Sequence, residues 1–249
     1  MTDSAPTFDV TFDFATDTPE GRDPDADSPT LRRYNQMLWS KPLKSGEVLM
    51  LDAPKVRSHG YLVYTAPDGN KVWFSSDAIT HSYTRSSRPK ALVAARAALS
   101  SDQQARYLNK PYTIGSATIW PVKQRPPMGI NSARGMRWST IGDRMDLTLE
   151  CIRRLYAGGQ DSPLAETLTY YDDFFSMFEG FREFVDFFHF QDLTTDDYTQ
   201  VEFFLPFEEF TRPATPRTVE EYVTYREATL AFIDQRQRRM SEWVSDHLN

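Results

Sequence analysis

The residue types best suited to chemistry gather in one glycine- and arginine-rich segment, MGINSARGMRWSTIGDR, at 128–144. Arg134, Arg137 and Arg144 carry guanidinium groups, which bind phosphate or carboxylate through paired hydrogen bonds. Asn131 adds an amide, and free backbone N–H groups at the start of the following helix favour an anion. The spacing matches neither GxxxxGK[ST] nor GxGxxG. We therefore interpret the segment as a candidate anion site, with internal ion pairing of the arginines as the alternative.

Two further cations flank Trp39 in LRRYNQMLWSK. Arg32 and Lys41 could clamp the same anion while the indole stacks on a ring of the ligand. The alternative is that their aliphatic stems lie over the core and that Trp39 is buried.

Acid–base candidates lie on the helix expected at 143–157. Asp146 and Glu150 share its polar face, where carboxylates at this spacing serve as general acid and base or hold a hydrated Mg²⁺. The same spacing gives Glu150 ion pairs with Arg153 and Arg154 on a solvated face. Both interpretations stay open, and the sequence assigns no metal ligand.

Two other polar clusters could carry chemistry. Asp23, Asp25 and Asp27 alternate in the acidic loop expected at 15–30, but the loop lacks the glycine and glutamate of a calcium loop, which favours a solvated loop. After an expected strand, His81 could act as a base oriented by Asp77. A capping aspartate beside a surface histidine is the commoner outcome.

These residues need a scaffold, and hydrophobic periodicity predicts an α+β fold. The first half is β-rich with about five strands, and it packs on a helix-rich, aromatic second half. Strands are expected at 8–14, 47–51, 61–65, 71–75 and 112–122, with another candidate at 201–207. The segments 61–65 and 71–75 form a hairpin around a Pro-Asp-Gly-Asn turn. Residues 123–142 are expected to form a loop.

Helices are expected at 31–39 with a Ser28 cap, 89–109 with a break near 100–102, 143–157, 163–178, 180–190 and 218–247. Between Tyr170 and Phe210, phenylalanines recur at helical spacing, which indicates core rather than a base-stacking surface. We expect a single domain over 1–249.

Charge is strongly segregated along the chain. Residues 31–144 carry 18 basic and six acidic side chains, a net +12, whereas residues 1–30 have net −7 and residues 145–249 net −12. A basic middle suggests an anionic partner, but the overall charge of −7 argues against nonspecific binding to duplex DNA. One cysteine, no signal peptide and no long apolar run predict a cytoplasmic protein that does not engage a membrane.

Several short sequence motifs together resemble those of an uncharacterised, mainly actinobacterial family of domains of unknown function. They are SPTLRRYNQMLWSKPL, YTIGSATIWP, INSARG, DRMDLTLECIRRLY, QDSPL and VDFFHFQDL. The resemblance runs from about Phe8 to Arg238, and Lys44 stands where such proteins often have proline. It implies a bacterial, cytosolic, single-domain protein, and it brings no activity or site residues.

Three functions follow as hypotheses, and whether the protein is an enzyme stays open. The first is binding, with or without processing, of a phosphorylated or nucleotide-like anion at the glycine- and arginine-rich loop. The second is a non-enzymatic module that docks on a partner protein. The third is a bacterial stress or phage-defence effector that acts on nucleic acid.

Overall fold

Four antiparallel strands form the sheet of this computed structural model, which describes residues 8–54, 61–83, 87, 89–108, 112–123 and 129–248. The strands lie in chain order: β1 (Leu51–Asp52), β2 (Leu62–Thr65), β3 (Lys71–Ala78) and β4 (Ala117–Val122). The predicted α+β class is confirmed, although the strand count is slightly below the expected five.

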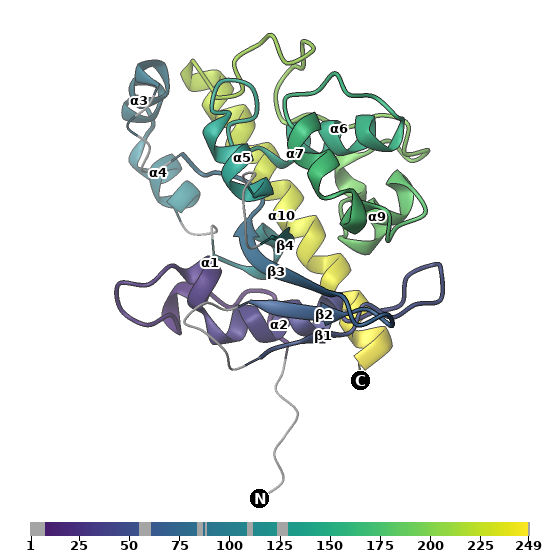
Figure 1. Cartoon of the computed structure of the whole chain (residues 1–249). Helices are drawn as coiled ribbons and strands as arrows, with labels where there is room; N and C mark the ends of the chain where they lie inside the picture. Colours follow the sequence, from purple (N-terminus) through teal and green to yellow (C-terminus); the bar gives the residue numbers. More distant parts are fainter. Residues whose placement is uncertain are drawn as a thin grey trace, which may run out of the picture.

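Ten α-helices lie in the described residues, most of them in the second half of the chain. They are α1 (Pro24–Asp27), α2 (Pro29–Trp39), α3 (Lys90–Ala97), α4 (Ser101–Leu108), α5 (Ile130–Met136), α6 (Met145–Tyr156), α7 (Ala165–Tyr170), α8 (Asp172–Phe175), α9 (Phe181–Phe187) and α10 (Val219–Leu248). Figure 1 shows α2 with the sheet in the lower part of the molecule and α5, α6, α7 and α9 above it. The long helix α10 runs through both parts and joins them.

The expected hairpin is confirmed as β2 and β3, which pair from Leu62↔Phe74 to Thr65↔Lys71. Gly69 takes the positive φ of 86° that its tight turn requires. Strand β3 also pairs with β4, and this register sets Asp77 opposite Thr118 near the carboxyl end of β3. The pairing therefore fixes the position of the Asp77 side chain on the sheet.

Helix α2 begins as its sequence predicts. The Ser28 hydroxyl accepts the Leu31 N–H at 3.1 Å, and Pro29 occupies the first turn. The Ser28 hydroxyl itself donates to Asp17 at 2.6 Å. These contacts anchor the segment that carries α1.

Two expected strands do not form. At 8–14, the Asp9 and Asp13 carboxylates accept the N–H groups of Thr11 and Ala15, so these donors cannot join a ladder. At 201–207, Val201 makes only an isolated bridge to Thr194.

Three other expectations need correction. The loop predicted at 123–142 contains α5. The Gly129 carbonyl accepts the Ala133 N–H at 2.9 Å and thereby begins the first turn of this helix. The helix predicted at 163–178 is divided into α7 and α8 at Tyr171. The acidic loop at 15–30 contains α1, which the Asp23 side chain caps at Asp25 N.

Aromatic rings fill the centre of the helical part, as the phenylalanine spacing predicts. Phe184 packs against Phe178 and Phe188 with ring centroids 5.4 and 5.0 Å apart, and all three are buried. Burying such rings is the main source of stability in a fold of this kind. In the described part of the chain, every helix is too short or too polar to cross a membrane.

Candidate functional site

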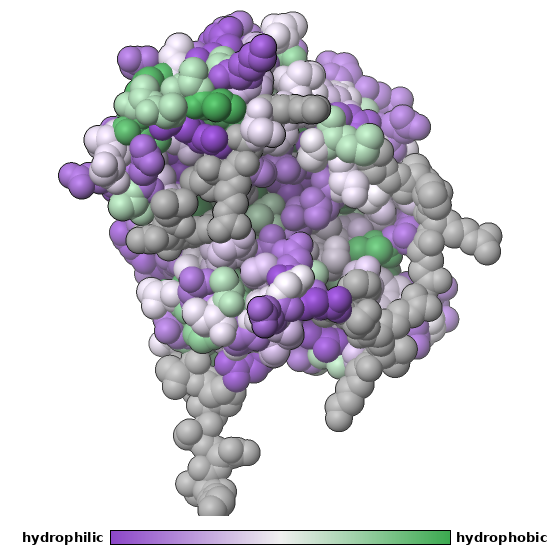
Figure 2. Space-filling model, turned by 90° about the vertical axis from the view of Figure 1, so that its left-hand side faces the viewer, coloured by the Kyte–Doolittle hydropathy of each residue, from purple (hydrophilic) through white to green (hydrophobic). Residues whose placement is uncertain are grey.

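A polar cleft of about 180 Å³ opens where α1, β3 and α5 meet. We call it the acidic cleft, and its polar lining comprises Asp23, Asp25, Tyr61, Ser75, Ser76, Asp77 and Asn131. On the face shown in Figure 2, hydrophilic residues gather in the hollow between the two parts of the molecule. Segments far apart in sequence thus contribute side chains to one concave, polar surface.

Helix α1 sets the position of Asp25. Pro24 fixes the first turn, and the Asp23 carboxylate accepts the Asp25 N–H at 3.2 Å. Because α1 packs against β3, Asp25 comes close enough to Asp77 for its charge to raise the pKa of Asp77.

Both carboxyl groups of this pair are easier to protonate than an ordinary aspartate. Burial, and then the charge of Asp23, raise the pKa of Asp25 to about 7. Burial also raises the pKa of Asp77 to about 8, with Asp25 and Asp143 adding to the effect. Arg134 and the Ala78 N–H oppose it. The pair can therefore hold or release a proton near neutral pH, as an acid–base pair must.

Arg134 supports the cleft from inside the protein. Its side chain is fully buried, and all five of its N–H donors have acceptors. They are Thr148 Oγ1 (3.0 Å), Asp77 Oδ2 (2.8 Å) and the carbonyls of Ala78 (3.2 Å), Ile79 (2.9 Å) and Asp143 (2.9 Å). No donor is left for a ligand, so Arg134 holds Asp77 in place.

Asn131 is the one predicted ligand-binding residue in the cleft lining. It lies in the first turn of α5 and is exposed, whereas Arg134 lies three residues later and points into the core. The unexpected helix explains the difference, because its buried face holds Ile130, Ala133 and Arg134, and Asn131 lies at the edge of that face, beside the cleft.

The other predicted arginines do not converge on the cleft. Arg144 is 2% exposed and forms an internal ion pair with Asp146, which is fully buried. Asp146 also accepts the Phe204 N–H at 2.9 Å. Arg137 donates to the Ala133 carbonyl at 3.3 Å. The internal-pairing alternative therefore describes Arg144.

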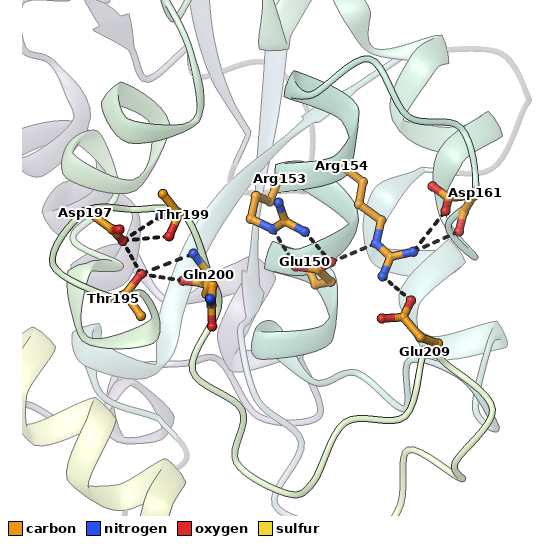
Figure 3. Close-up of polar contacts among 9 residues, drawn as sticks. All are labelled: Glu150, Arg153, Arg154, Asp161, Thr195, Asp197, Thr199, Gln200 and Glu209. Carbon is orange, nitrogen blue, oxygen red and sulfur yellow. Dashed lines mark hydrogen bonds and ion pairs between the residues drawn. The ribbon is translucent and has the colours of Figure 1, made fainter.

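Glu150, the second predicted catalytic residue, is held by two arginines. Its oxygens accept from Arg153 at 2.7 and 2.8 Å and from Arg154 at 2.7 Å (Figure 3). Arg154 also pairs with Asp161 and Glu209. Asp146 and Glu150 thus belong to two separate networks, with their oxygens engaged by protein donors.

Arg32 and Lys41 lie at opposite ends of α2. Arg32 donates to the carbonyls of Pro54 and Tyr61 at 2.7 and 2.8 Å, and burial lowers its pKa. Lys41 follows the other end of the helix, which spans about 16 Å at 1.5 Å per residue. They therefore do not form one anion clamp.

Asp77 does not orient His81 as a general base. The Nδ1 atom of His81 accepts the Tyr83 N–H at 2.8 Å, and burial lowers the histidine pKa. Asp77 instead bonds Arg134. Among the described residues, no group of three or more His, Cys, Asp or Glu side chains is arranged to hold a metal ion. The described residues therefore offer no ligand set for Mg²⁺, and whether the protein binds this ion stays open.

A second cavity, of about 330 Å³, lies between the α3–α4 arm and α10. Val93, Leu99, Tyr107 and Tyr222 give it a largely apolar lining. It holds no pair of titratable groups comparable to that of the acidic cleft. The acidic cleft is therefore the better candidate for chemistry.

Comparison with known proteins places residues 8–240 within a family model described as a family of unknown function, DUF6994. Neither a curated protein nor a solved structure matches the chain. Any function must therefore be argued from the geometry of the chain itself.

Proposed function

Because the chain belongs to DUF6994, a family of unknown function, we propose a function from its own geometry: the acidic cleft binds a small, positively charged, hydrogen-bonding ligand. A primary amine or a guanidine is the chemical class that fits. The single observation that carries this proposal is the meeting of Asp25 and Asp77, from α1 and β3, in one cleft.

Electrostatics favours a cation over an anion in this cleft. Three carboxyl groups line it, and the Arg134 guanidinium, which bonds Asp77, is enclosed and fully bonded. An anion would add repulsion, whereas an ammonium group would stabilise both carboxylates in their charged form. The anion hypothesis for the glycine- and arginine-rich loop stays a prediction, but Arg134 and Arg144 offer it no open guanidinium.

The size and polarity of the cleft narrow the ligand further. A volume of about 180 Å³ admits a small metabolite rather than a nucleotide. Asn131 and Ser75 add hydrogen-bonding groups beside the carboxyl pair. Because its pKa is about 8, Asp77 could also exchange a proton with the bound ligand.

Binding of 1,4-diaminobutane and agmatine, measured by isothermal titration calorimetry, tests the proposal. We expect both to bind, and 1,4-butanediol and glucose 6-phosphate to give no signal. Affinity should rise from pH 6 to pH 8.5, with proton release on binding, because the ligand stabilises the ionised carboxyl groups of Asp25 and Asp77. Asp25→Asn and Asp77→Asn should each weaken binding at least tenfold.

The matched control is Asp246→Asn, which removes the same charge from an exposed position at the end of α10. It should leave affinity unchanged. Equal binding of the diamine and the diol, or equal losses in all three variants, would reject the cation site. A heat signal from the sugar phosphate alone would restore the anion hypothesis.

The remaining hypotheses stay predictions. They are the protein-interaction module, the nucleic-acid effector, the cytoplasmic location and the actinobacterial distribution of the family.

A further inference from the structure

The amine of Lys41 lies in a box of aromatic rings at the junction of α2, α9 and α10. Its Nζ is 5.1 Å from the ring centre of Trp39, 4.6 Å from Phe187 and 5.1 Å from Trp243. The residue is only 6% exposed. The backbone is held too, because the Lys41 carbonyl accepts the Leu49 N–H at 3.1 Å.

Polar contacts of this amine are sparse. Among the described residues, its one hydrogen-bonding neighbour is Nε2 of His189, at 3.3 Å, and no carboxylate lies within ion-pair distance. A buried ammonium group normally has a carboxylate partner or several acceptors. The geometry thus provides poor support for a charged Lys41.

Burial and one neighbouring cation disfavour the charged form of the amine. Burial, followed by the charge of Arg236 on α10, lowers the pKa of Lys41 to about 7, while Asp186 on α9 opposes the shift. Arg236 donates only to carbonyl oxygens, so its charge is not neutralised locally. Arg239 is paired with Asp192 at 2.8 Å.

His189 is held in its neutral form. Burial and the charges of Lys41, Arg236 and Arg239 lower its pKa to about 2. Its Nε2 can therefore accept a hydrogen bond from the amine. This contact fixes the position of Nζ within the box.

We propose that Lys41 is a modification site whose buried amine accepts an acyl group from a small acyl phosphate. Desolvated lysines beside a second cation are the ones that act as nucleophiles in proteins. The surplus positive charge of Arg236 favours approach of the phosphate group and its departure. The 6% exposure of Lys41 limits the donor to a small molecule.

The step is an ordinary acyl transfer. The Nζ lone pair attacks the carbonyl carbon, and a C–N bond forms. The C–O bond to phosphate then breaks, and phosphate leaves with the electron pair and takes the amine proton. The product is a neutral amide, which removes the cost of a desolvated cation.

Acetyl phosphate is the probe for this site, with the intact protein at pH 7 and mass spectrometry as the readout. Lys44 is exposed and only three residues away, so it serves as an internal control. With a pKa near 7, about half of Lys41 is neutral, against about one part in 2,500 for an ordinary lysine. We expect Lys41 to be acetylated at least about tenfold faster than Lys44, and before the other lysines.

Two further measurements make the result decisive. The advantage of Lys41 should disappear in the urea-unfolded chain and shrink as the pH rises toward 10, where ordinary lysines also lose their proton. An amine that stays unlabelled, or that follows the pH dependence of Lys44, would overturn the proposal. Lys41 would then be a protonated side chain held by cation–π contacts for structural purposes only.

Discussion

The buried charged side chains of this molecule differ in their hydrogen-bond partners, and these partners decide which side chains are available to a ligand. Arg134 and Arg144 each face an aspartate, whereas Arg236 donates to the carbonyls of Phe188, Gly115 and Ala117. Such residues tie distant segments together, at the cost of desolvating a charge. Their donors are occupied, so chemistry is left to groups at the edges of these networks, such as Asp25 and Lys41.

The two catalytic candidates from the sequence should therefore behave as structural residues of unequal weight. Asp146→Asn leaves the buried Arg144 cation without its partner, and we expect a loss of about 3–5 kcal/mol in the free energy of unfolding. Glu150→Gln should cost only about 1 kcal/mol, because Arg153 is 30% exposed and Arg154 keeps Asp161 and Glu209. Urea unfolding followed by circular dichroism measures both. Small and equal losses would contradict the assignment and return both residues to the list of catalytic candidates.

At the scale of elements, periodicity predicted what local sequence controls. The hairpin β2–β3, the capped helix α2 and the broken α3–α4 pair all follow from turn residues and spacing within a few positions. The failures depend on partners distant in sequence. At 201–207, the Phe204 N–H goes to Asp146, 58 residues away, and Pro206 has no donor, so apolar character alone could not reveal that no strand forms.

One element contact depends on the absence of a side chain. Gly115 lies in the short 3₁₀ turn before β4, against α10, where an added Cβ would lie 2.5 Å from Gln237 Cγ and 2.6 Å from the Ile233 carbonyl. We expect Gly115→Ala to force the turn and α10 apart and to destabilise the protein by about 1–3 kcal/mol.

Gly129→Ala is the matched control, because its Cβ would meet only the Tyr171 hydroxyl, at 3.8 Å. It should cost less than about 1 kcal/mol. Thermal unfolding of the two variants compares them directly. A Gly115→Ala protein as stable as Gly129→Ala would show that α10 does not pack tightly on this turn.

At the scale of the whole molecule, the segregated charges meet inside the fold. Cations of the basic middle pair with acids of the second half, as in Arg106–Glu227 at 2.7 Å and Lys123–Asp173 at 3.0 Å. The net +12 of residues 31–144 is therefore partly neutralised by the chain itself, which weakens the sequence argument for an anionic partner.

The acidic cleft shows the same limit of sequence reasoning. Asp25 and Asp77 each stood out in the sequence as a chemical candidate, but in separate clusters with other partners. Their meeting depends on how α1 packs against β3, 52 positions further along the chain, which no local pattern records. Asn131 could be assigned to a site from sequence. The inward direction of Arg134 follows from α5, and the glycines of this segment favoured the prediction of a loop instead of that helix.

Stability as a function of pH tests this arrangement in the intact protein. In the folded state Asp77 has a pKa of about 8, above its unfolded value, so it binds more protons folded than unfolded between about pH 4 and pH 8. Its contribution to stability is fully present below pH 4 and is lost as the pH rises toward 8. The neutral Asp77→Asn variant does not lose this contribution, and its Oδ1 can still accept from Arg134. Its stability relative to the wild type should therefore increase steadily from pH 4 to pH 8.

Paired urea titrations at pH 4, 6 and 8 measure this difference, and Lys41, His81 and His189 cancel because both proteins contain them. Asp246→Asn, with its exposed position, should show no such trend. A flat or falling difference would mean that the Arg134 guanidinium, 2.8 Å away, keeps Asp77 ionised throughout this range. Asp25 would then be the only group of the cleft able to exchange a proton near neutral pH, and the proposed cation would meet a carboxylate already committed to Arg134.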